Sequence, residues 1–100
     1  MTTSVFLNND RTMPLLGLGL YKATADDEAE NAIISAAKNG YRLFDTASAY
    51  KNEESVGRGI ARCGVPRKDL FITTKIWNNA QRLGDVDGAF ERSLDRLGLD

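Results

Sequence analysis

The chain alternates between short apolar runs and longer stretches in which apolar residues recur every three or four positions. A short run predicts a strand buried on both faces, and the longer pattern predicts an amphipathic helix. Three runs fit a strand, namely Leu15–Leu20, Tyr41–Asp45 and Leu70–Lys75, and a helical pattern follows each of them. This order predicts right-handed strand–helix–strand units and an α/β fold with a parallel sheet.

A hairpin is predicted before the first of these strands. The segment Asn8–Asp10 favours a turn, because Asn and Asp tolerate left-handed backbone and hydrogen bond to their own main chain. It separates Ser4–Leu7 from Arg11–Met13, which could pair as two arms. Pro14 has no N–H to donate and is expected to close the second arm.

Each predicted helix lies between a capping residue and a glycine. Ser, Thr, Asp and Asn accept hydrogen bonds from the first N–H groups of a helix, and glycine readily adopts the left-handed conformation that ends one. The predicted start and stop residues are Thr24–Asp27 with Gly40, Asn52 with Gly64, and Asp85 with Gly98. The predicted inward-facing residues are Ala29, Ala32, Ile33, Ala36 and Ala37, then Val56, Ile60 and Cys63, then Val86, Ala89, Phe90, Leu94 and Leu97.

The composition of the chain excludes several kinds of partner and site. The 100 residues suffice for one small domain, and the net charge of −1 gives no reason to expect nucleic acid or a membrane as partner. With one cysteine and no histidine, the chain cannot supply an intramolecular disulfide, a Ser–His–Asp triad or a usual zinc site. No secretion signal or membrane span is recognisable, so we expect a soluble, cytoplasmic protein.

Two glycines in the first strand, Gly17 and Gly19, suggest a dinucleotide-binding fingerprint. That interpretation is weak, because the third glycine would fall at Lys22 and no helix begins directly after the glycines. Either both glycines allow close backbone approach in a crowded interior, or a ligand approaches at Gly19, where the strand ends.

Polar residues stand at the carboxyl ends of the predicted strands. Asp45 ends the second strand and Lys75 the third, Gly19 lies at the end of the first, and Tyr50 follows in a loop. The carboxyl ends of parallel strand–helix units open onto one face, which carries the active site in barrels. Each residue alone is more commonly a cap, a packing residue or a surface charge. Their shared face favours a site.

These side chains suit proton donation. A buried phenol beside an ammonium gives up its proton more readily, because the phenolate is stabilised. A carboxylate in contact with that ammonium keeps it protonated and fixes its direction. Such a phenol can protonate a carbonyl oxygen while the carbon receives a hydride, which an organic cofactor must supply.

Longer segments resemble one family. Residues 40–60, GYRLFDTASAYKNEESVGRGI, closely resemble the N-terminal signature of the aldo-keto reductases. Residues 70–78, LFITTKIWN, resemble the segment with that family's catalytic lysine, and residues 13–22, MPLLGLGLYK, match its first barrel strand and turn. The likeness runs from Ser4 to Asp100. It is greatest to the branch that includes 2,5-diketo-gluconate reductases and prostaglandin F synthase-like reductases.

The resemblance implies a (β/α)8 TIM barrel, of which residues 1–100 would form the N-terminal hairpin and the first three βα units. It implies NADPH-dependent reduction of a small aldehyde or ketone by a full-length, monomeric protein. Tyr50 would donate the proton, Lys75 would activate it, and Asp45 would hold Lys75 and touch the cofactor. The implied cofactor contacts are Gly19, Leu20, Tyr21 and Asp45, and the implied substrate-pocket residues are Tyr21, Tyr50 and Trp77.

The chain ends before the family's catalytic histidine and its contacts to the adenosine phosphate. We therefore expect these residues to belong to a longer protein and to be inactive alone. Two alternatives stay open: a cofactor-binding regulatory or structural protein on the same fold, and an enzyme with Lys75 as a Schiff-base nucleophile. A carboxylate at Asp45 argues against the second, because it keeps the lysine charged.

Overall fold

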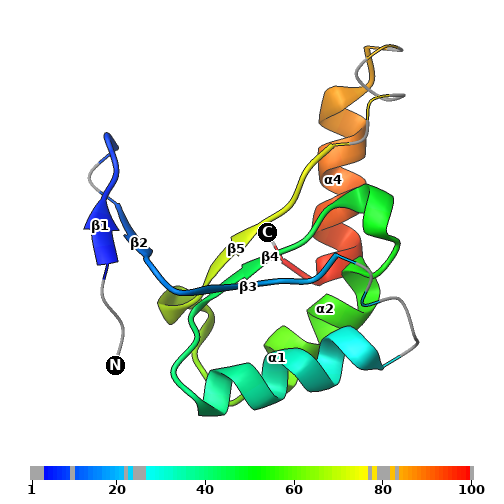
Figure 1. Cartoon of the computed structure of the whole chain (residues 1–100). Coiled ribbons are helices and arrows are strands. Elements are labelled where there is room, and N and C mark those ends of the chain that lie inside the picture. Colours follow the sequence, from blue (N-terminus) through cyan, green and yellow to red (C-terminus); the bar gives the residue numbers. More distant parts are fainter. Residues whose placement is uncertain are drawn as a thin grey trace.

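A computed structural model describes residues 4–9, 11–21, 23, 27–76, 78, 82 and 84–99. Within them a hairpin leads into a three-stranded sheet, and helices cover one face of that sheet (Figure 1). No helix in this described part is long and apolar enough to cross a membrane.

The predicted hairpin is confirmed. Strand β1 (Ser4–Phe6) pairs antiparallel with β2 (Thr12–Pro14), and Ser4 lies opposite Pro14. Pro14 therefore belongs to the second arm, where the prediction had it only closing the arm. A proline is tolerated there because this two-stranded ribbon has a free edge that requires no N–H donor.

The parallel sheet is also confirmed. It has the order β3 (Gly17–Gly19), β4 (Leu43–Asp45) and β5 (Phe71–Thr73). The register places Leu18, Phe44 and Ile72 in one row facing the helices, and Phe44 is fully buried. Side chains alternate across a strand, so the next row, Gly19, Asp45 and Thr73, lies on the opposite face.

The expectation that the first strand is buried on both faces is wrong for these residues. Leu15 is 60% exposed and Leu16 is 46% exposed. The helices lie on one side of the sheet only, as Figure 1 shows, so the other side of β3 is uncovered. The two glycines also differ. A Cβ at Gly17 would lie 2.7 Å from the Leu43 side chain, whereas a Cβ at Gly19 would meet nothing within 4 Å.

The helices follow the predicted order. They are α1 (Glu28–Lys38), α2 (Glu53–Arg62) and α4 (Val86–Leu97), with short 3-10 helices at Ser48–Tyr50 (η1) and Arg67–Asp69 (η2). The predicted stop glycines all have positive φ, which only glycine adopts without strain. They are Gly40 (92°), Gly64 (82°) and Gly98 (71°).

The predicted side-chain caps of α2 and α4 are not formed. Asn52 and Asp85 occupy the N-cap positions, but neither makes a side-chain cap hydrogen bond. The Asn52 amide is engaged elsewhere, and Asp85 pairs with Arg92 at 2.8 Å. In the first predicted cap only Asp27 lies within the described residues, and it too makes no such bond.

Helix α2 packs between α1 and α4, and its glycines allow the close approach. A Cβ at Gly57 would lie 2.6 Å from the carbonyl oxygen of Leu97, and one at Gly59 would lie 3.0 Å from the Cβ of Ile33. On α4 the predicted stripe is partly wrong, because Val86 and Phe90 are exposed. The residues of α4 that are buried are Ala89, Ser93 and Leu97.

The core lies between the sheet and the helices. It joins the end of β3 to all three helices. Its buried members are Leu20, Ala29, Ile33, Ala37, Phe44, Val56, Ile60, Leu70 and Leu97.

Candidate active site

Asp45 ends β4 at the centre of the sheet. Its backbone carbonyl accepts a hydrogen bond from Leu20 N–H at 2.9 Å, and the next residue, Thr46, donates its N–H to Thr73 O at 2.8 Å. These bonds hold the carboxyl ends of all three strands at one level. The Asp45 side chain lies on the face away from the helices, as the period of two requires.

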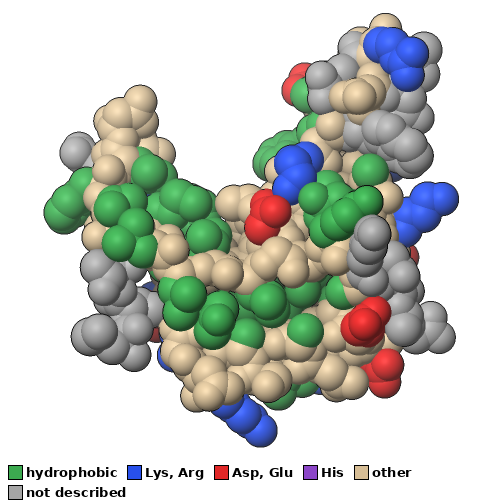
Figure 2. Space-filling model, viewed as in Figure 1, with side chains coloured by type: hydrophobic (Ala, Val, Ile, Leu, Met, Phe, Trp, Pro, Cys, Tyr) green, Lys and Arg blue, Asp and Glu red, His purple; other side chains and the backbone are tan. Residues whose placement is uncertain are grey.

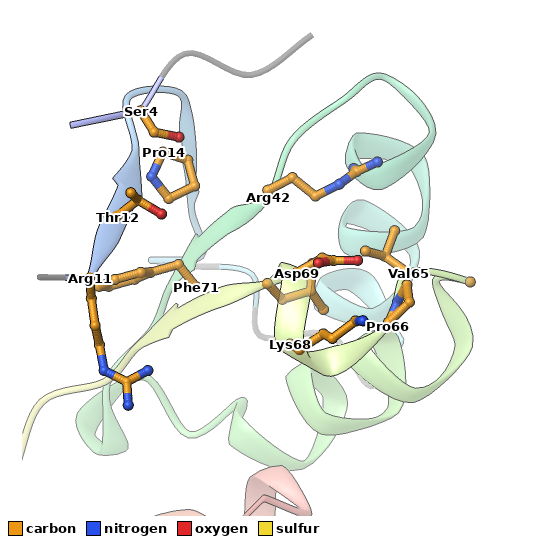
Figure 3. A pocket seen from close by; sticks show the side chains of 12 residues that line it. Ser4, Arg11, Thr12, Pro14, Arg42, Val65, Pro66, Lys68, Asp69 and Phe71 are labelled. Atoms are coloured by element: carbon orange, nitrogen blue, oxygen red, sulfur yellow. The ribbon is translucent and has the colours of Figure 1, made fainter. Parts of the chain in front are cut away.

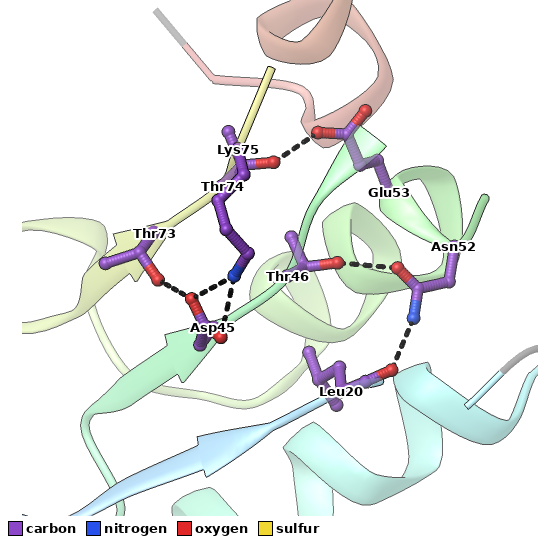
Figure 4. A network of polar contacts seen from close by, with 8 residues as sticks. All are labelled: Leu20, Asp45, Thr46, Asn52, Glu53, Thr73, Thr74 and Lys75. Atoms are coloured by element: carbon purple, nitrogen blue, oxygen red, sulfur yellow. Dashed lines mark hydrogen bonds and ion pairs between the residues drawn. The ribbon is translucent and has the colours of Figure 1, made fainter. Parts of the chain in front are cut away.

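Lys75 reaches Asp45 from the segment that follows β5. Its Nζ lies 3.0 Å from both carboxylate oxygens of Asp45 (Figure 4). The Thr73 hydroxyl donates a further hydrogen bond to the Asp45 Oδ1. The side chains of Asp45 and Lys75 are 44% and 52% exposed, so a ligand can reach the pair.

The pair favours its charged form. Partial burial opposes ionisation of Asp45, but hydrogen bonds from Thr73 and Lys75 and the Lys75 charge outweigh it and lower the pKa of Asp45. Partial burial also disfavours the charged Lys75. The hydrogen bonds and charge of Asp45, with smaller contributions from Tyr50, overcome this and raise the pKa of Lys75. The lysine is therefore a fixed ammonium.

Tyr50 lies at the end of η1, beside Lys75. The Lys75 Nζ is 5.2 Å from the centroid of the Tyr50 ring. Backbone contacts maintain this arrangement, because the N–H and the hydroxyl of Ser48 both donate to the Lys75 carbonyl at 3.1 Å. Thus Asp45, Tyr50 and Lys75, which the sequence analysis placed on one face, are brought together.

The other predicted site residues lie in different surroundings. Tyr21 is 67% exposed, and its ring centroid is 5.2 Å from that of Tyr50. Gly19 stands next to Asp45 in the sheet register. The Leu20 side chain is buried in the core, which shows a packing role, and its predicted cofactor contact stays a prediction. Trp77 lies outside the described residues.

Two pockets lie at opposite ends of the sheet. One of about 710 Å³ is lined in part by Lys75, Ile76, Asn78 and Val86. Figure 2 shows an acidic and a basic side chain side by side on this hollowed face, with apolar side chains around them.

The second pocket measures about 780 Å³ and lies between the hairpin and the segment before β5 (Figure 3). Arg11, Arg42 and Lys68 contribute to it, but no predicted site residue does. Of the predicted catalytic residues, only Lys75 lines the first pocket. We therefore place the candidate active site around Asp45, Tyr50 and Lys75, beside that pocket. Among the described residues, no group of three or more His, Cys, Asp or Glu could hold a metal ion.

Two residues at the start of α2, Asn52 and Glu53, make buried polar contacts that the sequence analysis did not predict. The Asn52 amide donates to Leu20 O at 2.9 Å and to Ala23 O at 3.2 Å, and it accepts the Thr46 hydroxyl at 2.6 Å. Glu53, assigned only to the helix dipole, is 1% exposed. Its partners are Thr74, Ser93 and Arg96.

One feature of the sequence could have revealed Glu53. Ser93 stands four residues from both Ala89 and Leu97, in phase with the inward side of α4. A hydroxyl on a buried stripe needs a polar partner.

With the fold and site described, the chain can be compared with known proteins. Residues 15–100 match the aldo/keto reductase family. The chain belongs to this family. It is 50% identical over 97 residues to a glyoxal reductase of Bacillus subtilis, covering 97% of this chain and 35% of that protein. It is also 50% identical over 97 residues to an aldo-keto reductase of Mycolicibacterium vanbaalenii, covering 97% and 34%.

Solved structures of aldo-keto reductases also match the chain. An aldo-keto reductase from Brucella melitensis matches with a TM-score of 0.92 and 43% identity, over 100% of this chain and 39% of that one. An aldo-keto reductase of Bombyx mori in complex with NADP matches with a TM-score of 0.91 and 40% identity, over 98% and 35%. The chain therefore spans somewhat over a third of the length of these relatives.

Proposed function

We propose that the full-length protein reduces aldehydes or ketones to alcohols with NADPH, and that Tyr50 donates the proton. The observation that carries the proposal is the position of Lys75. Its ammonium contacts the Asp45 carboxylate at 3.0 Å and lies 5.2 Å from the Tyr50 ring, on the exposed face of the sheet.

The three side chains have different roles in the proposed reaction. Asp45 keeps Lys75 protonated and aimed. The ammonium stabilises negative charge on the Tyr50 oxygen as the phenol proton moves to the carbonyl oxygen of a substrate. General acid catalysis of this kind contributes about 10² to 10⁴ in rate. The Ser48 bonds to the Lys75 carbonyl tie the backbone of η1, which carries Tyr50, to the backbone that carries Lys75.

The residues present fit a nicotinamide cofactor. The site of a Gly19 Cβ is open for 4 Å around, directly beside the exposed Asp45 carboxylate. Gly19, Tyr21 and Asp45 would hold the cofactor. NADPH, when bound, supplies a hydride to the carbonyl carbon. The Bombyx mori relative, solved in complex with NADP, supports this assignment.

The substrate would be a small carbonyl compound that lies against Tyr50 and Tyr21. The name of the Bacillus subtilis relative, glyoxal reductase, supports a short aldehyde. The proposal includes a closed (β/α)8 barrel, a monomeric full-length protein and a cytoplasmic location, as the family resemblance implies.

The test uses the full-length protein with NADPH and glyoxal. We expect NADPH oxidation by the wild type, and loss of turnover with retained NADPH binding in Tyr50→Phe. The matched control is Tyr41→Phe, which loses the same hydroxyl from a residue that packs against the core. Unchanged turnover in Tyr50→Phe would contradict the proposed mechanism.

Two further measurements on the full-length protein decide between the alternatives. NADPH binding without turnover over a broad panel of carbonyl compounds would favour a non-catalytic protein. Covalent trapping of a carbonyl on Lys75 by borohydride would favour a Schiff-base enzyme. The raised pKa of Lys75 opposes the latter, because a Schiff base forms from the neutral amine.

A further inference from the structure

Two consecutive threonines at the end of β5 bond to carboxylates on opposite faces. The Thr73 hydroxyl donates to Asp45 on the exposed face, and the Thr74 hydroxyl donates to Glu53 Oε2 at 2.7 Å on the helix face (Figure 4). This follows from the alternation of side chains along an extended chain. The residue directly after them is Lys75. The backbone that carries Lys75 is therefore held from both sides.

Glu53 is a rigid anchor for this segment. It is buried, and its second oxygen, Oε1, accepts the Ser93 hydroxyl at 3.1 Å and Arg96 Nε at 2.8 Å. A buried carboxylate is costly unless its oxygens are satisfied, so each bond resists displacement. Because Glu53 begins α2 while Ser93 and Arg96 lie on α4, two helices fix its position.

Lys75 depends on such an anchor. It lies two residues beyond the last paired residue of β5. Its carbonyl accepts hydrogen bonds from Ser48, in the short η1 segment. Thr74 adds a link from the base of Lys75 to the packed interior on the helix side.

We propose that Glu53 is a positioning residue of the reductase: through Thr74 it fixes the backbone from which Lys75 reaches Asp45 and Tyr50. The inference rests on the proposed function. Small errors in the placement of a catalytic group lower the rate strongly. Loss of the Thr74 bond therefore acts on catalysis, beyond any effect on stability.

Two matched substitutions separate these effects. Thr74→Val and Ser93→Ala each remove one hydroxyl from Glu53, but only Thr74 lies on the segment that carries Lys75. In the full-length protein we expect Thr74→Val to lower kcat on the order of tenfold or more. We expect Ser93→Ala to leave kcat within about twofold, and Thr74→Ser, which keeps the hydroxyl, to restore the wild-type rate.

The dependence of kcat on pH is a second test of the positioning role. Among the described residues, the titratable groups in contact with Lys75 are Asp45 of β4 and Tyr50 of η1. A Lys75 drawn away from Asp45 and Tyr50 no longer interacts with them as in the wild type, so the limbs of the kcat profile should shift in Thr74→Val. A smaller folded fraction would scale the profile without moving it.

Crystal structures of the two variants test the inference without turnover. We expect the distance from Lys75 Nζ to the Asp45 carboxylate to lengthen in Thr74→Val and to stay at its wild-type value in Ser93→Ala. Wild-type kcat, pH profile and distance in Thr74→Val would overturn the positioning role. A wild type without carbonyl reduction would refute the proposed function, while the two distances would still decide the positioning.

Discussion

Two carboxylates near the end of β5 make the same kinds of contact and do different things. Asp45 and Glu53 each accept a threonine hydroxyl and each pair with a cation, Lys75 for the former and Arg96 for the latter. The Asp45 side chain is 44% exposed and that of Glu53 only 1%. Exposure separates the two: the first pair can act on a ligand, and the second can act only on the protein.

The energetics differ accordingly. An ion pair open to solvent contributes about 0 to 1 kcal/mol to stability, because water screens it. A buried pair costs desolvation, and it is strongly destabilising to break because one charge is left behind. We therefore expect substitutions on the exposed face to change activity more than stability. Substitutions that break the Glu53 pair should lower the free energy of unfolding more than substitutions of the exposed pair.

The largest effect is expected at the exposed pair. Lys75→Met removes the ammonium beside Tyr50 and should lower kcat/KM about 10² to 10⁴-fold, the usual range for general acid catalysis. The free energy of unfolding should change by at most about 1 kcal/mol. Steady-state kinetics and urea unfolding of the full-length protein measure both, with the exposed Lys38→Met as control. A large loss of stability with intact activity would show that the Lys75–Asp45 pair serves stability and not catalysis.

The next effect concerns the buried carboxylate. Glu53→Gln keeps the shape but leaves Arg96 without its partner. We expect destabilisation by about 2 kcal/mol, below the range for fully buried pairs, because the Arg96 side chain is 36% exposed. The control, Glu54→Gln, changes an exposed neighbour and should stay within about 0.5 kcal/mol. Equal urea midpoints for the two variants would show that burial does not matter here.

A third substitution alters the packing that brings α4 to Glu53. Gly57→Ala places a Cβ 2.6 Å from the backbone oxygen of Leu97, so α4 must move away. Overpacking typically costs about 1 to 3 kcal/mol, and the better helix propensity of alanine offsets part of it. We expect a net loss of about 1 to 2 kcal/mol in thermal unfolding, against almost none for the exposed Ala61→Ser. Wild-type stability in Gly57→Ala would show that the helices can separate freely.

The smallest effect is the pH dependence of the exposed pair. The pKa of Asp45 is lowered from 3.8, so its stabilisation is present above that pH and is lost as the pH falls through the lowered pKa. The pKa of Lys75 is raised from 10.5, so its stabilisation is present below that pH and is lost as the pH rises through the raised pKa.

The difference in unfolding free energy between wild type and Asp45→Asn measures this window. It should be greatest between these two limits and no more than about 1 kcal/mol, because both side chains are half exposed. The exposed Asp87→Asn on α4 serves as the control. A difference that persists unchanged well below pH 3.8 would contradict the ion pair as its origin.

Much of this arrangement was predictable from the sequence. The apolar runs located the strands, and the glycines that end the helices have the positive φ that only glycine adopts freely. The meeting of Asp45 and Lys75 followed from topology, because parallel strands end at one edge. These features depend on local residue pattern or on the order of elements along the chain, and both can be read from a sequence.

Tertiary structure alone decided the remainder. The local sequence explains Asn52 as a helix cap and Glu53 as an acid in the first turn of a helix. In the structure both side chains instead point inward and bond to partners from distant segments. Likewise Phe90 fits a helical stripe but is exposed, since α4 meets α2 along Ala89, Ser93 and Leu97. Which face of a helix meets a neighbour depends on close approaches such as that at Gly57. These involve residues about forty positions apart, which no local period records.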